Sequence, residues 1–171
     1  FVIGHVGRLV YQKNQAFLLE AFAALVQIRP DSRLLLVGEG ADRSALARKA
    51  ADLGIADRVI FHGPSNRVPE LLWAMDVFAF PSIFEGLGIA AVEAQAAGLC
   101  TLCSDAVPPE AALTPLFHAL PLDAGPELWA SALLEAAQAR RTDRAAAADQ
   151  VAAAGFDLAD VAARVRDAHW G

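Results

Sequence analysis

The stretch DVFAFPSIFEGLGIAAVEAQAAGLCTLC, residues 76–103, contains the pattern that decides the fold. Residues 76–80 form a short apolar run typical of a buried strand. After the turn Pro81-Ser82, residues 88–97 follow a helical pattern that Gly98 closes, and residues 99–103 form a second apolar run. Strand, helix and strand in this order are typical of a parallel sheet.

The same alternation continues on both sides of this stretch. Asn14 can cap a helix, Pro69 can start one, and Gly38 to Gly40 end a buried strand. Short apolar strands between helices predict an α/β, Rossmann-like, doubly wound parallel sheet with helices on both faces. The further strands are expected at 2–6, 33–37, 59–62 and 116–120, and the further helices at 15–28, 42–53, 68–75, 126–139, 143–153 and 157–168.

The composition fits one globular domain. The chain has 171 residues, of which 56% are hydrophobic and 20% charged. These values exclude a disordered, collagenous or coiled-coil protein. The apolar stretches are short and interrupted, so no membrane-spanning helix or secretory signal is expected. The chain opens on a strand-like run without an initiator Met, and we expect it to be cut from something longer.

The charge is distributed unevenly. The formal net charge is −6, and residues 91–171 supply all of it. No Lys or Arg lies between Arg67 and Arg140, so a clustered basic surface for nucleic acid is not expected. Lys13 and Lys49 are the two lysines of the sequence.

Cysteines and histidines suggest packing more than chemistry. Cys100 and Cys103 form a C-x-x-C pattern without zinc partners, and on a strand they point to opposite faces. We expect two buried free thiols, which suit a reducing cytoplasm. The histidines lie on or beside apolar runs and are interpreted as core or edge residues: His5, His62, His118 and His169.

The first loop, GRLVYQKN at 7–14, is a candidate anion site. Gly7 lets the backbone turn closely, and Arg8 and Lys13 flank a loop that leads into a helix. Cations beside free helix amides favour a bound anion. By position alone, a pair of solvated surface side chains explains them equally well.

Glu85 and Glu93 carry the strongest signal. They form a Glu-x7-Glu spacing, with Glu85 in a loop and Glu93 in the following helix. A carboxylate accepts two hydroxyl donors, which suits the vicinal diol of a sugar. A continuous helix would separate the two by about 12 Å, comparable to the span from ribose to hexose across a diphosphate. The alternative for Glu93 is a plain surface residue.

A dinucleotide fingerprint overlaps this region. Gly86, Gly88 and Ala91 fit G-x-G-x-x-A, and Asp105 follows at a suitable spacing. Five residues separate the pattern from its strand, and Glu85 would repel the pyrophosphate. No Asp-x-Asp motif offers a seat for a metal, so no metal site or cofactor is expected, and Arg8 and Lys13 would have to neutralise a diphosphate.

Taken together, these residues resemble the nucleotide-sugar-binding, C-terminal domain of family 4 (group 1) glycosyltransferases, which have the GT-B fold. The segments EAQAAGL and LPLDAGPELWA, at 93–99 and 120–130, resemble the exopolysaccharide and capsule branch. Cys100 stands where the family commonly has Pro. The resemblance covers nearly the whole chain, in the segments 7–22, 34–40, 59–63, 68–99 and 104–105.

The resemblance implies a role for each matching residue. Arg8 and Lys13 would bind the donor diphosphate with the backbone of Leu87, Gly88 and Ile89. Glu85, Gly86 and Leu87 would bind the transferred sugar, and Glu93 the ribose. Gly63 and Arg67 would lie near the base. Glu85, Arg8 and Lys13 are the expected catalytic residues.

The implied activity is transfer of a hexose from an NDP-sugar, expected to be a UDP-sugar, to a glycan or lipid-linked acceptor. Transfer would proceed with retention and without metal. Alternatives are a GT-B-type epimerase, an NAD-binding domain and a scaffold module. We expect a single domain over 1–171, an acceptor domain outside it, no sugar transfer by the chain alone, and a cytoplasmic protein able to associate peripherally with a membrane.

Overall fold

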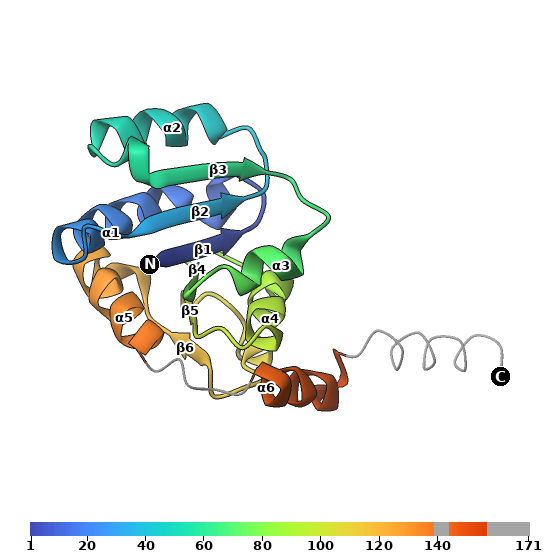
Figure 1. Cartoon of the computed structure of the whole chain (residues 1–171). Helices are drawn as coiled ribbons and strands as arrows, with labels where there is room; N and C mark the ends of the chain where they lie inside the picture. Colours follow the sequence, from blue (N-terminus) through green and yellow to red (C-terminus); the bar gives the residue numbers. More distant parts are fainter. Residues whose placement is uncertain (139–143, 157–171) are drawn as a thin grey trace.

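The computed structural model describes residues 1–138 and 144–156. These residues form a parallel six-stranded sheet in the order β3-β2-β1-β4-β5-β6, shown in Figure 1. The strands are β1 Val2–Val6, β2 Arg33–Val37, β3 Val59–Gly63, β4 Val77–Phe80, β5 Thr101–Cys103 and β6 Phe117–Ala119. The predicted Rossmann-like α/β class is confirmed.

Helices cover both faces of the sheet (Figure 1). The α-helices are α1 Gln15–Ile28, α2 Arg43–Asp52, α3 Val68–Trp73, α4 Ile89–Ala96, α5 Pro126–Gln138 and α6 Arg144–Val151. Short 3-10 turns lie at η1 Tyr11–Lys13, η2 Ala56–Arg58, η3 Pro109–Ala111 and η4 Leu122–Ala124, and a π-helical turn, η5, at Ala152–Phe156. The helix predicted at 157–168 lies outside the described residues, as does His169.

Two apolar cores form, one on each face of the sheet. On one face, α1, α2 and α5 bury residues such as Phe22, Leu46 and Trp129. On the other, α3 and α4 bury Leu72 and Val92 against Phe78. Apolar side chains of the strands must find cover on both sides, which is why the strands are almost continuously hydrophobic.

The two cysteines fall one into each core. Cys100 packs in the core beneath α1 and α5, and Cys103 packs in the core beneath α4. Both are buried free thiols, as predicted, and burial raises the pKa of the Cys103 thiol. Both are therefore interpreted as packing residues, and for Cys103 the raised pKa also makes the thiol a poor nucleophile.

Element ends depart from the predictions by a few residues. The strand predicted at 99–103 begins at Thr101, because the Leu99 N–H bonds back to the Ala94 carbonyl and completes the end of α4. Asn14 takes the N-cap position of α1, but its φ is 53° and its side chain makes no capping bond. In the described residues, no helix has the length and apolar character needed to cross a membrane.

Candidate functional site

The sheet brings together two loops that lie far apart in the sequence. The chain moves outward from β1 to β3, then returns to place β4 on the other side of β1. At such a reversal, loops after neighbouring strands diverge and leave a crevice at the carboxyl ends of the strands. We define the first loop as residues 7–14, after β1, and the second loop as residues 81–88, after β4.

The first loop is fixed on the end of β2. The Gly7 N–H donates to the Val37 carbonyl (2.9 Å), and the Leu9 N–H donates to the Glu39 carbonyl (2.9 Å). Gly38 has a φ of 132°, and a Cβ there would lie 2.1 Å from the Gly7 carbonyl oxygen. Glycine is required at this position, since any side chain would push the first loop off the sheet.

The second loop is hydrogen-bonded to the first. The Ile83 N–H donates to the Gln12 carbonyl (2.8 Å), and the Gln12 side-chain amide donates to the Phe84 carbonyl (2.9 Å). The Ser104 hydroxyl donates to the Ser82 carbonyl from the other side (2.5 Å). Gln12 thus clamps the second loop through both its main chain and its side chain, a role that no sequence pattern had indicated.

Lys13 and Glu85, two predicted site residues, form an ion pair between the first and second loops. Lys13 Nζ lies 2.5 Å from Glu85 Oε1, and the side chains are only 15% and 7% exposed. The ammonium also lies 4.7 Å from the centre of the Phe80 ring, a cation–π contact. The prediction placed these residues in one site, whereas their direct contact is new.

A buried histidine, His5, lies beneath the first loop. His5 Nδ1 lies 2.9 Å from the Ala79 carbonyl oxygen, and His5 Nε2 lies 3.1 Å from the Gln15 amide nitrogen. Burial lowers the pKa of His5 from 6.5 to about 4, so the ring is neutral at pH 7. The carbonyl can only accept, so Nδ1 carries the proton and donates. The prediction of a satisfied core histidine is confirmed.

Gln15 connects that histidine to the first loop. Its side-chain amide also donates to the Arg8 carbonyl (2.8 Å), and the residue is buried. The Arg8 side chain, by contrast, is exposed and has no hydrogen bond or ion pair with the described residues. Arg8 therefore has a fixed backbone and a guanidinium available to an anion.

The second loop ends at the start of α4. Gly88 adopts a left-handed conformation (φ 83°, ψ 52°), and its carbonyl accepts the Ala91 N–H (2.8 Å). The first N–H groups of a helix have no partner within it, so this turn offers donors to a ligand. Gly86 lies in open space, and Ile89 is exposed. The helix begins at Ile89, so the 12 Å estimate for a continuous helix from Glu85 does not apply.

Glu93 lines a cavity between α3 and α4. The cavity has a volume of about 290 Å³ and apolar walls from Val68, Pro69, Leu72, Trp73, Ala96 and Ala97. Glu93 is exposed at the rim of this cavity, and partial loss of solvent there raises the pKa of its carboxyl group. The carboxylate makes no hydrogen bond or ion pair with the described residues, so it can accept from a bound molecule.

The predicted base-binding residues lie at the entrance to α3. Gly63 ends β3, and its carbonyl accepts the Gly38 N–H (2.8 Å). Arg67 precedes Val68, which lines the same cavity as Glu93. The Arg67 guanidinium bonds the Glu70 carboxylate (3.1 Å) at the surface. A hydrogen bond from the Glu70 backbone and, after it, this bond from Arg67 lower the pKa of Glu70.

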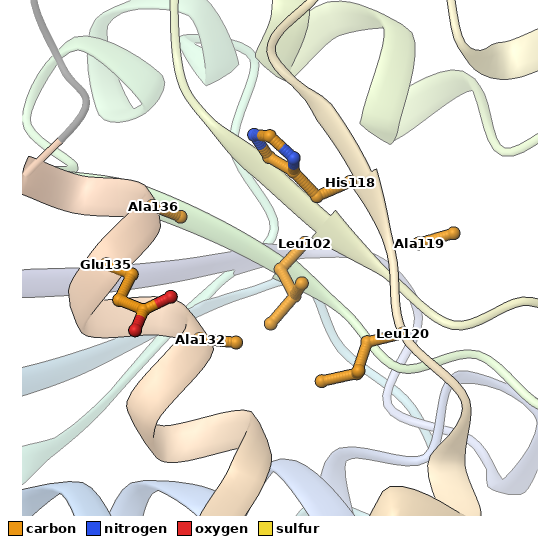
Figure 2. Close-up of a pocket in the computed structure, with 7 residues that line it drawn as sticks. All are labelled: Leu102, His118, Ala119, Leu120, Ala132, Glu135 and Ala136. Atoms are coloured by element: carbon orange, nitrogen blue, oxygen red, sulfur yellow. The ribbon is translucent and has the colours of Figure 1, made fainter.

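A separate cavity lies at the β6 edge of the sheet. It has a volume of about 350 Å³, and the side chains of Leu102, Leu120 and Ala132 meet in it (Figure 2). His118 and Glu135 are its polar neighbours, and it shares no residue with the predicted site. His118 and His62 are exposed on the two edge strands, as expected. No cluster of metal-binding side chains occurs within residues 1–138 and 144–156.

Comparison with known families identifies the class of protein to which this fold belongs. Residues 1–148 match the family described as "Glycosyl transferases group 1". This match covers most of the chain, so the chain belongs to that family, as the resemblance predicted.

Curated relatives lead to the same class. The chain is 35% identical to EpsF of Bacillus subtilis (strain 168) over 157 residues, which are 91% of this chain and 41% of EpsF. It is 36% identical over 108 residues to the UDP-Gal:alpha-D-GlcNAc-diphosphoundecaprenol alpha-1,3-galactosyltransferase of Escherichia coli, covering 61% of this chain and 28% of that enzyme.

Solved structures share the fold. Anabaena Alr3699/HepE in complex with UDP and glucose has a TM-score of 0.79 and 25% identity, over 98% of this chain and 47% of that chain. WaaG, a glycosyltransferase involved in lipopolysaccharide biosynthesis, has a TM-score of 0.77 and 24% identity, over 99% and 47%. The chain spans less than half the length of these relatives.

Proposed function

We propose that this chain binds the nucleotide-sugar donor in a glycosyltransferase that moves a hexose to a glycan or lipid-linked acceptor. The observation that carries this proposal is the direct contact between the first and second loops at the carboxyl ends of β1 and β4. It brings together Lys13, Glu85 and the backbone of Arg8 from segments 72 residues apart in sequence. Cations and a carboxylate side by side suit a ligand with an anionic and a hydroxylated part.

Each part of the donor would contact its own set of residues, from the first and second loops to the start of α3. Arg8 and Lys13 would hold the diphosphate with the backbone of Leu87, Gly88 and Ile89, where α4 begins. Glu85 would accept bonds from the transferred sugar next to Gly86 and Leu87, and Glu93 from the ribose. The base would lie between Gly63 and Arg67, beside the cavity that Glu93 lines.

Sugar transfer requires stabilisation of the negative charge that develops on the leaving diphosphate. Breaking the bond between the anomeric carbon and the diphosphate oxygen leaves negative charge on the diphosphate. The Arg8 guanidinium, the Lys13 ammonium and the backbone amides of α4 would stabilise that charge where it develops. Fixed cations in this place support transfer without a metal ion, and we infer retention at the anomeric carbon from the family resemblance alone.

The similar proteins support a particular class of donor and of acceptor for this chain. The Alr3699/HepE complexes contain UDP, glucose and UDP-glucose, which supports a UDP-hexose donor here. The Escherichia coli relative is named for a diphosphoundecaprenol-linked sugar, which supports a lipid-linked acceptor. On the family resemblance we also propose polysaccharide synthesis in the cytoplasm with peripheral membrane association.

Calorimetric titration tests the proposal. UDP and UDP-hexoses are titrated into the 171-residue chain and into its Lys13→Ala and Glu93→Gln variants. We expect binding by the wild type and at least tenfold weaker binding by each variant, because each loses an ionic or bidentate contact. Lys49→Ala is the matched control, since Lys49 pairs with Glu20 between α2 and α1. Absence of any UDP or UDP-hexose binding by the wild type would exclude the proposal.

A further inference from the structure

The Lys13–Glu85 pair places two groups in contact that the proposed function assigns to different parts of the donor. Lys13 would hold the diphosphate, and Glu85 would hold the sugar. In the structure, the ammonium and the carboxylate lie 2.5 Å apart and bond each other. Binding at either end of the donor therefore changes what the other end meets.

The surroundings make this pair strong. Both side chains are largely removed from solvent, so water screens their attraction less than it screens a surface pair. The Phe80 ring covers the ammonium, and His5 beneath it is neutral at pH 7 and adds no competing positive charge. In the described part of the chain, neither residue forms another ion pair.

A bare nucleoside diphosphate meets an obstacle in this arrangement. Its phosphate must either displace the Glu85 carboxylate from Lys13, leaving a buried carboxylate without its cation, or bind beside it and repel it. For a nucleotide-sugar, separating Glu85 from Lys13 costs less free energy, because hydroxyl groups of the sugar can donate to the carboxylate in place of the lysine.

We propose that Glu85 makes the site discriminate between the sugar-charged nucleotide and the bare nucleoside diphosphate. This inference rests on the proposed function and adds a second role for Glu85. While the sugar is present, its hydroxyls hold the carboxylate and Lys13 holds the diphosphate. Once the sugar has left, the carboxylate returns to Lys13 and weakens the hold on the spent nucleotide.

The test compares two ligands in matched variants. UDP and the UDP-hexose that binds the wild type most tightly are titrated by calorimetry into the wild-type chain, Glu85→Gln and Glu85→Ala. We expect both variants to bind UDP about fivefold or more tightly than the wild type, because Lys13 is released. The preference for UDP-hexose over UDP should shrink. Glu20→Gln is the control, since it removes the other lysine–glutamate pair and should leave both affinities unchanged.

The outcomes separate this inference from the function on which it rests. If the Glu85 variants fold, as judged by circular dichroism, and bind UDP no more tightly than the wild type, the discrimination role is wrong. Loss of UDP binding in Lys13→Ala would in that case still support the donor site. If the wild type binds neither ligand, both proposals fail. Two variants are used so that misfolding of one leaves the measurement possible.

Discussion

At the scale of single residues, His5 joins the first loop to the centre of the sheet. Its ring lies between the Ala79 carbonyl and the Gln15 amide, and Gln15 also holds the Arg8 carbonyl. The ring is fully buried and stacks against Phe78 and Phe80. Protonation would put a second charge under Lys13 and remove the acceptor that Gln15 uses.

We expect acid to destabilise the fold through this residue. The pKa of His5 is about 4 in the folded chain and 6.5 without the fold, so the unfolded state takes up the proton first. The stabilisation is complete above pH 6.5 and is lost as the pH falls from 6.5 toward 4. Through His5 alone, the free energy of unfolding in urea should be about 2 kcal/mol lower at pH 5 than at pH 7.

The control for this prediction is His5→Asn, whose amide can keep the bond to Ala79 but does not titrate. Between pH 7 and pH 5, the free energy of unfolding should fall by about 2 kcal/mol less in the variant than in the wild type. An equal pH dependence in both would contradict the assignment. If the variant does not fold, an NMR titration of the wild-type ring should show no protonation above pH 5.

The sequence predicted the kinds of residue in the site better than their partners. Arg8, Lys13 and Glu85 were predicted because they lie in loops that follow strands, where parallel sheets bind ligands, and because the family resemblance gives them roles. The contact between Lys13 and Glu85 depends on β1 and β4 being neighbours, which the order of elements along the chain does not fix. Gln12 and Gln15 carry no motif, so their clamping bonds were not predictable.

At the scale of elements, the start of α4 depends on Gly88. Its left-handed backbone turns the second loop into the helix, and a Cβ there would lie 3.3 Å from Phe80 and Val107 side chains. Alanine would meet backbone strain and crowding together. We expect Gly88→Ala to lower the free energy of unfolding by about 1–2 kcal/mol in urea titration.

Gly86 is the matched control for this prediction. It lies two residues earlier in the same loop, and a Cβ there would meet nothing within 4 Å. We expect Gly86→Ala to change the free energy of unfolding by less than about 0.5 kcal/mol. Equal destabilisation by the two substitutions would show that the loop, and not the Gly88 conformation, sets the cost.

Helices and strands were predictable where burial patterns are long and continuous. The helix predicted at 15–28 and the strand at 33–37 match α1 and β2 residue for residue. Short strands were placed less well. The predicted strand at 116–120 is reduced to β6, Phe117–Ala119, and at its start the Phe117 N–H donates to the Thr114 carbonyl of the preceding turn. Turn bonds of this kind leave no mark in hydrophobic patterning.

At the scale of the whole molecule, the chain covers under half of each relative described above. In the proposed function the first and second loops bind the donor, and no described residue has a role toward an acceptor. We therefore expect the chain to bind a UDP-hexose without transferring its sugar. Release of UDP, measured with saturating UDP-hexose and lipid-linked acceptors, should equal that of Lys13→Ala. Faster release by the wild type would contradict this prediction.

The two halves of the sheet are joined where β1 pairs with β4, and this pairing is short. Only two residue pairs join these strands in register, Ile3 with Val77 and Gly4 with Phe78. Side chains reinforce the junction at both ends, with the Val2 N–H donating to the Asp76 carboxylate (2.9 Å) and His5 bonding Ala79. The first and second loops meet at the carboxyl ends of these two strands. A ligand that contacts both loops would link the two halves of the sheet, and we expect it to slow amide hydrogen exchange in both halves together.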